Sequence, residues 1–333
     1  YIALNNQPDK QLTLILRSSS GNRMAAYIGD GEADSQEVDS LIESLPKIPF
    51  LRKFHCYKYD GFWYRENHLR AVLSCKKHFR FQDSDILLTS FPKCGTTWLK
   101  SILYTIINRL RNPIGSEDHP LLTNSPHTLV RGFENDLYAN NAIPDLSNMH
   151  APRLFQLMHQ LYHFVMRNHK DCFNSFWHFL NKLKSLEAST VSLDEFFDSF
   201  CSGRNAYGPF WDHVVRHWNV SLAMPGKLMF LSYEQIIEQP DHYVKKMAEF
   251  MGCPFSRVEE DEGVVSGIVK MCSFTHLSQL EANKSGRTKS GADHCAFFRQ
   301  GEVGDSKNLL SSEMIKRIDQ IAQNNFSPYG LKI

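Results

Sequence analysis

The sequence lacks a net charge, a long apolar run and a recognisable leader segment. Its 37 Lys and Arg residues nearly balance its 36 Asp and Glu residues, so no overall positive field attracts nucleic acid. No apolar run reaches the roughly 18 residues of a membrane span, and the apolar run at 12–16 is too short for a signal peptide. We therefore expect a cytoplasmic protein with neither a nucleic-acid partner nor a membrane partner.

The sequence also lacks the motifs of zinc proteins and of P-loop kinases. Its eight cysteines are scattered, with no C-x-x-C pair and no spacing typical of zinc ligands, and we expect them to be reduced thiols. The Walker A pattern G-x-x-x-x-G-K-[ST] does not occur, which argues against a kinase with a Mg²⁺ site.

Residues 85–109 carry the most informative pattern that is present. The run Ile86, Leu87 and Leu88 is typical of a buried parallel strand, and Pro92 and Gly95 then interrupt it. Apolar residues follow at helical spacing, at positions 99, 102, 103, 106, 107 and 110. The pattern predicts a strand, a tight loop and a helix.

The loop between this strand and helix has the residues of an anion site. Gly95 lets the backbone approach a ligand closely, and a helix N-terminus offers unpaired N–H groups and a positive dipole end. Lys93 adds a charge, and Thr96 and Thr97 add hydroxyl donors. The loop predicts binding of phosphate or sulfate, although an ordinary strand–helix turn with a solvated lysine would show the same local pattern.

The loop string F-P-K-C-G-T-T-W at 91–98 resembles the 5′-phosphosulfate-binding loop of the cytosolic sulfotransferases, and the chain looks most like their plant branch. The resemblance implies transfer of a sulfuryl group from the cosubstrate 3′-phosphoadenosine 5′-phosphosulfate (PAPS), with no metal. Lys93 would be catalytic because it would stabilise charge on the bridging oxygen of the leaving nucleotide. The cofactor-binding residues that the resemblance implies in this loop are Lys93, Cys94, Gly95, Thr96, Thr97 and Trp98.

A second apolar run at 161–166 predicts another buried strand, and the charged string R-N-H-K-D at 167–171 follows it at once. Open α/β sheets bind ligands at the carboxyl ends of their strands, although a solvated strand end would look alike. By resemblance to the family, Arg167 and Ser175 bind the 3′-phosphate. The planar fork of Arg suits such a group.

Later segments match the family in the same order along the chain. The resemblance places Tyr207 near the adenine, makes Ser273 a nucleotide ligand, and stacks Phe274 on the adenine opposite Trp98.

The last matching segment is F-F-R-Q-G-E-V-G-D-S-K at 297–307. The resemblance assigns the 3′-phosphate to Arg299, Gln300 and Gly301. Gln300 stands where the family often has Lys or Arg, which removes one charge. Ser306 stands where the family usually has Trp, and we expect it to loosen the packing of this loop.

The chain departs most from the family at the general base. The plant family has its catalytic His in P-R-L-F-A-T-H-x-P-Y, whereas this chain reads P-R-L-F-Q-L-M-H-Q at 152–160. Met158 takes the catalytic position and cannot accept a proton, while His159 lies one residue further on. The segment between Arg153 and Arg167 is also shorter than in the family.

Three interpretations of this departure stay open. His159 rotates into place and serves as the base; the chain is a catalytically impaired, nucleotide-binding homologue; or the gap is a gene-model error. Loss of a general base typically costs ~10²–10⁴ in rate, so an enzyme without one would be slow.

We predict a single α/β domain, with a central parallel sheet flanked by helices in the P-loop-like sulfotransferase fold, and the nucleotide at the carboxyl ends of the strands. The domain is expected at 45–333, after a flexible tail at 1–44. Residues 1–23 are expected to be non-native because Met24 resembles a natural start.

Other elements are expected along the chain. They are a long loop with short helical pieces at 112–150, a helix capped by Ser192, a strand at 227–232, a helix at 241–251 ended by Gly252, and an amphipathic helix at 312–321.

The aromatic-rich segment at 45–81 is the candidate for acceptor contacts. Most of its rings are expected in the core, and Phe62 and Trp63 are candidates to touch the acceptor. The resemblance implies a small hydrophobic hydroxylated acceptor, such as a flavonoid, a jasmonate or a steroid, within plant secondary metabolism. It is compatible with a homodimer, and the oligomeric state stays open.

Overall fold

The computed structural model describes residues 31–51, 54–139, 143–157, 163–183 and 191–332. Met158 and His159 lie outside the described residues, as do residues 1–30.

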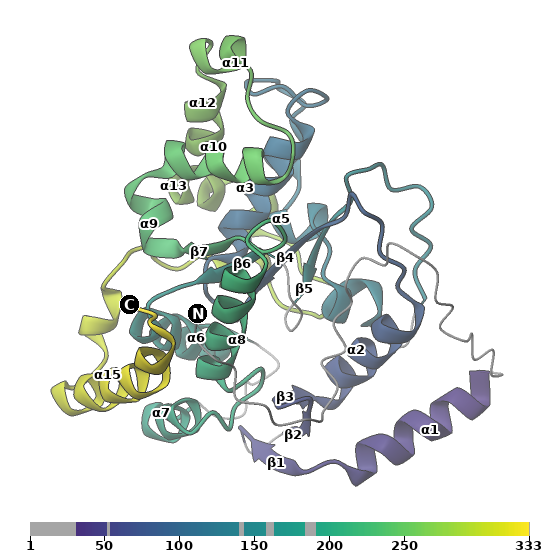
Figure 1. Cartoon of the computed structure of the whole chain (residues 1–333), viewed down its shortest axis with the longest axis vertical. Coiled ribbons are helices and arrows are strands. Elements are labelled where there is room, and N and C mark those ends of the chain that lie inside the picture. The colour runs from purple at the N-terminus through teal and green to yellow at the C-terminus, as the bar shows by residue number, and fades with distance from the viewer. Residues whose placement is uncertain (1–30, 52–53, 140–142, 158–162, 184–190, 333) are drawn as a thin grey trace.

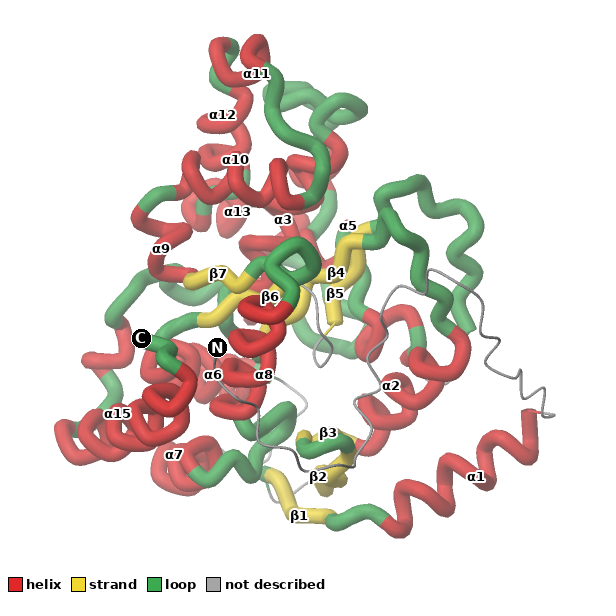
Figure 2. Tube along the Cα trace, in the orientation of Figure 1, coloured by secondary structure: helices red, strands yellow, loops and turns green. Residues whose placement is uncertain are grey.

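A sheet of four parallel strands lies at the centre of the molecule (Figures 1 and 2). Its strands, in spatial order, are β5 (Leu154–Leu157), β4 (Ile86–Ser90), β6 (His163–Met166) and β7 (Phe230–Ser232). Every neighbouring pair is parallel. The predicted strands at 86–88, 161–166 and 227–232 are thus present as β4, β6 and a shorter β7, whereas β5 was not expected.

Helices cover both faces of this sheet, as side-chain alternation along β4 requires. Ile86 and Leu88 pack with the apolar sides of α3 (Thr96–Asn108), α10 (Pro240–Phe250) and α12 (Val264–Met271). Leu87 points the other way, into a cluster with α2 (Glu66–His78) and the π-helix η1 (Phe133–Leu137). The predicted α/β class with a flanked parallel sheet is confirmed.

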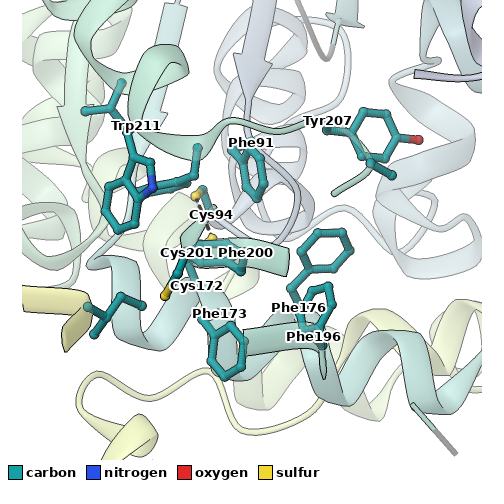
Figure 3. Close-up of a cluster of buried hydrophobic side chains, with 14 of the residues drawn as sticks. Phe91, Cys94, Cys172, Phe173, Phe176, Phe196, Phe200, Cys201, Tyr207 and Trp211 are labelled. Carbon is teal, nitrogen blue, oxygen red and sulfur yellow. Dashed lines mark hydrogen bonds between the residues drawn. The ribbon is translucent and has the colours of Figure 1, made fainter. Parts of the chain in front are cut away.

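A third cluster, rich in phenylalanine, fixes the segment after β4 (Figure 3). The ring of Phe91 lies edge-on to those of Phe176, Phe200 and Phe210. These rings come from α6 (His169–Lys182), α7 (Leu193–Cys201) and α8 (Phe210–Ala223). The packing of these rings therefore fixes the start of the loop that follows Phe91.

The segment 31–65 departs from expectation. Its strands β1 (Lys47–Phe50), β2 (Phe54–Tyr59) and β3 (Phe62–Arg65) form an unpredicted antiparallel sheet. The predicted tail at 1–44 is corrected over Gly31–Ser44, which forms helix α1. Ile42 of α1 is buried with Leu69 and Val72 of α2, so this helix is docked by its few apolar side chains.

The remaining predicted elements are present. The segment 112–150 holds α4 (Pro120–Thr123), α5 (Pro126–Leu129) and η1. The Ser192 side chain accepts a hydrogen bond from the Glu195 N–H at the start of α7. Gly252 follows α10 with a left-handed φ of 73°, and the predicted C-terminal helix is present as α15 (Ser312–Phe326).

The other helical pieces complete the chain. They are α9 (Tyr233–Glu238), α11 (Arg257–Asp261), α13 (Phe274–Gln279), α14 (Glu281–Lys284), η4 (His294–Phe297), η5 (Asp305–Asn308) and η6 (Ser327–Tyr329). Within the described ranges, no helix is both long and apolar enough to cross a bilayer.

Candidate active site

A cavity of about 510 Å³ lies where β4 and β6 end. The loop between β4 and α3, helix α6, the start of α13 and the segment 297–301 all contribute to its wall. The structure therefore brings together sequence segments that were singled out separately. The predicted site residues in the wall are Lys93, Gly95, Thr96, Thr97, Trp98, Arg167, Ser175, Tyr207, Ser273, Phe274, Arg299, Gln300 and Gly301.

The loop after β4 adopts a backbone that suits an anion. Lys93 has φ of 71° and Gly95 has φ of 95°, so two left-handed residues turn the chain from the strand into α3. A Cβ on Gly95 would lie 2.6 Å from the ring of Tyr233, so only glycine fits. Helix α3 begins at Thr96, and the first N–H groups of a helix lack intrahelical partners.

The ammonium of Lys93 lies 4.3 Å from the ring centroid of Phe179 and 5.5 Å from that of Phe297. Burial first, and then the nearby charges of Arg167, Lys182 and Arg299, together lower the pKa of Lys93 to about 7. Positive charges gathered in a low-dielectric site repel one another. The arrangement favours an anionic ligand, because an anion removes this repulsion.

The two threonine hydroxyls of the loop are each held by a second side chain. Thr96 Oγ1 lies 2.5 Å from Ser90 Oγ. Thr97 Oγ1 lies 2.9 Å from Nε2 of His127, and Nδ1 of the same ring lies 3.4 Å from the ammonium of Lys100. When Lys100 is charged it can only donate, so Nδ1 accepts and Nε2–H donates to Thr97. The Thr97 hydroxyl proton then stays available for a ligand.

Sequence reasoning missed both Lys100 and His127, which line the cavity. The Lys100 side chain is almost wholly buried, and burial lowers its pKa to about 8 against the opposing effect of Asp136 and Glu134. A lysine among the apolar residues of the predicted helix was a usable signal for Lys100. Nothing local to the 112–150 segment distinguished His127.

Arg167 and Arg299, which the resemblance assigns to the 3′-phosphate, both line the cavity. Arg167 donates to the carbonyls of Lys93, at 3.3 Å, and Glu302, at 2.8 Å. Arg299 forms an ion pair with Asp305. Each of the two arginines keeps a buried Nε–H that has no acceptor among the residues that the structure describes. Buried donors are normally satisfied, so these two fit an anionic group of a nucleotide.

The loop at 301–307 is anchored by its neighbours. The Asp171 carboxylate accepts hydrogen bonds from the N–H groups of Gly304, at 2.6 Å, and Ser306, at 3.0 Å. Tyr233 donates its hydroxyl to the Gly301 carbonyl at 3.2 Å. Ser306 is itself buried. Asp171 thus binds the backbone of the loop directly, and the expected loosening at Ser306 stays a prediction.

The predicted adenine partners also line the cavity. The Trp98 ring packs edge-on against Tyr233, with centroids 5.6 Å apart, and Phe274 faces Phe298 at 6.1 Å. A Cβ on Gly301 would lie 2.6 Å from the Phe274 ring. The Ser273 side chain caps α13 by accepting from the His276 N–H at 3.2 Å, which leaves its hydroxyl proton for another acceptor.

Tyr207 and Cys94 differ from the other predicted residues. The Tyr207 ring stacks on His68, and its hydroxyl lies 2.6 Å from His68 Nδ1, so it belongs beside α2. The Cys94 side chain is buried away from the cavity, and its thiol donates to the sulfur of Cys172 at 3.5 Å (Figure 3). The thiol of Cys94 therefore points away from the cavity, and the predicted contact of this residue with the nucleotide stays a prediction.

The two aromatic residues that are candidates to touch the acceptor lie outside the cavity wall. Phe62 and Trp63 are buried in the core and do not line the cavity. Phe50, Phe54 and Phe179 line it instead, together with two polar side chains, Arg65 and His68.

The family model of the sulfotransferase domain matches residues 83–330. The chain belongs to the sulfotransferase family. Cytosolic sulfotransferase 5 of Arabidopsis thaliana is 44% identical over 313 residues, which are 90% of this chain and 97% of that protein. Cytosolic sulfotransferase 11 of the same plant is 40% identical, over 97% of this chain and 95% of that protein. The plant branch predicted from the sequence is confirmed.

Solved structures of sulfotransferases share the fold. A solved structure of an Arabidopsis thaliana sulphotransferase has a TM-score of 0.71 and 32% identity, covering 93% of this sulfotransferase and 99% of that chain. A mouse sulfotransferase complexed with 3′-phosphoadenosine 5′-phosphate (PAP) has a TM-score of 0.60 at 20% identity, covering 81% and 94% of the two chains. The second likeness supports the fold alone.

Proposed function

We propose that this sulfotransferase is an active enzyme that transfers the sulfuryl group of PAPS to a hydroxyl of a small hydrophobic acceptor. The observation that carries the proposal is the convergence of Lys93, Arg167 and Arg299 in one cavity, beside a helix N-terminus. Two buried N–H donors of these arginines have no acceptor in the described part of the chain. Three cations and unused donors match the charges of a doubly phosphorylated nucleotide.

In this proposal the nucleotide spans the cavity. Arg167, Ser175 and Arg299 bind the 3′-phosphate, with Gln300 and the Gly301 backbone beside them. The 5′-phosphosulfate lies on the loop of Lys93, Gly95, Thr96 and Thr97, and the adenine lies between Trp98 and Phe274. Ser273 bonds the nucleotide, and Tyr207 contacts it from the side of α2.

The chemical step is an in-line displacement at sulfur. The acceptor oxygen forms a bond to sulfur while the bond from sulfur to the bridging phosphate oxygen breaks, and the acceptor loses its proton. Lys93 stabilises the charge that develops on the bridging oxygen, and Thr97 donates its hydroxyl proton to the same group. Positioning and charge stabilisation supply most of the rate in such transfers.

We assign the removal of the acceptor proton to His159, which lies outside the described residues. A homologue that binds nucleotide but transfers slowly is the alternative if His159 does not reach the acceptor.

The proposal further places the enzyme in the cytoplasm, in agreement with the names of its relatives, and in plant secondary metabolism, with a flavonoid, a jasmonate or a steroid as acceptor. A homodimer stays part of the proposal.

Two assays on the same protein test the proposal. Calorimetry measures PAP binding, and transfer of labelled sulfate from PAPS is measured on a panel of a phenol, a flavonol and a steroid. We expect binding, and transfer that collapses in both Lys93→Ala and His159→Ala. Lys245→Ala, which breaks an exposed pair with Glu260, is the matched control. Binding without transfer favours the impaired homologue, and absence of PAP binding overturns the proposal.

A further inference from the structure

One cation of the cavity wall has no part in the proposed chemistry. Arg65, at the end of β3, lines the cavity. Within the part of the chain that the structure describes, its guanidinium makes no ion pair and no hydrogen bond, and its Nε is buried without an acceptor. Its ring contact is with Phe54, whose centroid lies 4.0 Å from the guanidinium carbon.

The other cations of the wall are already engaged. Arg167 is held by two carbonyls and Arg299 by Asp305, and Lys100 lies against His127. Lys93 lies between two rings on the phosphosulfate loop. Among the described residues of the cavity wall, Arg65 is thus the cation that neither pairs with a protein group nor has a proposed contact with the nucleotide.

The surroundings of Arg65 are apolar or neutral. Phe50, Leu51 and Phe54, which precede Arg65 closely in the chain, also line the cavity. His68 is close enough to feel the charge of Arg65, and burial first, then this charge, lowers the His68 pKa to about 3, so the imidazole is neutral at physiological pH. Tyr207 is hydrogen-bonded to that neutral imidazole. None of these groups compensates the positive charge of Arg65. The charge of the buried Glu134 carboxylate also acts on Tyr207, but it forms no ion pair with Arg65 among the described residues.

We propose that Arg65 binds a carboxylate of the acceptor, so that the enzyme acts on a hydroxylated carboxylic acid with an apolar body. The planar fork of a guanidinium bonds a carboxylate through two parallel N–H groups, and one guanidinium balances one carboxylate charge. A phosphate dianion suits Arg65 less well than a carboxylate does, because Arg65 is a single cation, whereas each proposed phosphate position in this cavity combines several donors. The inference rests on the proposed function, because it treats the cavity beside the nucleotide as the acceptor site.

The experiment compares an acid with its neutral ester. ω-Hydroxylauric acid and its methyl ester are titrated calorimetrically into the protein saturated with PAP. We expect the acid to bind about 10- to 100-fold more tightly than the ester, which is the range for a hydrogen bond to a charged group. Sulfate transfer to the two compounds should show the same preference in KM.

Arg65 variants assign that preference to the residue. In Arg65→Gln the acid should fall to the affinity of the ester, while ester binding and PAP binding stay unchanged. Arg65→Lys, which keeps the charge but loses the fork, should retain part of the preference. Arg216→Gln is the matched control, because it removes a nearby, half-exposed cation that pairs with Asp60 and lies outside the cavity wall; it should leave the preference intact.

Several results would overturn the inference. Equal binding of acid and ester by the unmodified protein would do so, as would failure of both to bind. Weaker PAP binding in Arg65→Gln would make Arg65 a nucleotide ligand instead. A preference for the acid that depends on Arg65, found together with no sulfate transfer to any acceptor, would sustain the carboxylate site while refuting the proposed activity, so the two failures are distinguishable.

Discussion

Lys93 combines a positive charge, a nearly enclosed position and cationic neighbours, and its protonation should therefore respond to a ligand. Its pKa of about 7 in the free protein results from burial and from Arg167, Lys182 and Arg299. Phosphate groups of a bound nucleotide would offset these effects and raise this pKa. The coupling between proton and nucleotide follows from linkage.

We expect PAP binding to take up a proton above pH 7, where Lys93 of the free protein is largely neutral, and PAP affinity to fall as the pH rises further. Calorimetry in two buffers with different ionisation enthalpies measures this uptake. Lys93→Arg should bind PAP without that proton, because Arg stays charged throughout. The same uptake in the Arg variant would show that another group titrates.

His127 acts on Thr97 rather than on the reacting atoms, so its loss should affect orientation. We expect His127→Phe, which keeps a ring against Phe297, to lower kcat about 10-fold, the value of one hydrogen bond, with little change in the KM of the acceptor. His127→Gln, which restores an N–H donor, should recover part of the rate.

Steady-state kinetics on the two His127 variants checks this prediction, with the exposed His242→Ala as control. A rise in acceptor KM at constant kcat would contradict it, because His127 would then contact the acceptor instead of orienting Thr97.

At the scale of elements, the cofactor side is assembled by α6. Its first turn carries Asp171, which holds the loop at 301–307, and its third turn carries Phe179, which contacts Lys93. A single helix thus positions two segments that are more than 100 residues apart in the chain. The loop depends on this helix for its backbone hydrogen bonds.

Asp171→Asn should loosen the loop, because the amide oxygen of Asn can accept from only one of the Gly304 and Ser306 N–H groups, and the amide nitrogen cannot accept from the other. The loss of charge-assisted hydrogen bonds at a buried site corresponds to about 1–3 kcal/mol, so we expect a lower melting temperature and PAP binding weakened about tenfold. Amide hydrogen exchange at Gly304 and Ser306 should accelerate. Asp194→Asn, at an exposed position, is the control, and unchanged exchange in the Asp171 variant would refute the anchoring role.

The elements that the sequence predicted well are those with a strong local pattern. The segment from β4 to α3 concentrates an apolar strand, two breaking residues and a helical stripe within a short stretch, and its boundaries agree with the structure. Helix α1 was missed because it has few apolar side chains, and its docking depends on α2, which is distant from Ile42 in the chain. The sheet of β1 to β3 was not predicted, because aromatic residues lie on both of its faces and its strands therefore lack the alternation of apolar and polar residues that indicates a strand.

At the scale of the whole molecule, the site is made of contacts that no local pattern contains. Arg167 meets the Glu302 carbonyl across 135 positions, and Asp171 meets Gly304 across 133. The family resemblance supplied the expected ligands, and the sheet explains why they converge, since β4 and β6 are parallel neighbours. Neither the local patterns nor the family resemblance pointed to Arg65 and His127. Both residues become candidates only when the folded chain shows that they line the same cavity.

Because PAP would bridge segments from β4 to residue 301, its binding should stabilise the molecule as a whole. A ligand at 100 times its Kd adds about 2.7 kcal/mol to the free energy of unfolding. At about 2–4 °C per kcal/mol for a domain of 150–250 residues, this corresponds to a rise in Tm of roughly 5–11 °C. Thermal melts with and without PAP measure this rise. His159→Ala should keep it, because this residue is assigned to proton removal, whereas a variant that lacks both Arg167 and Arg299 should lose it. If His159→Ala also loses the rise, the segment that holds His159 is part of the nucleotide site, and the assignment of a displaced base fails.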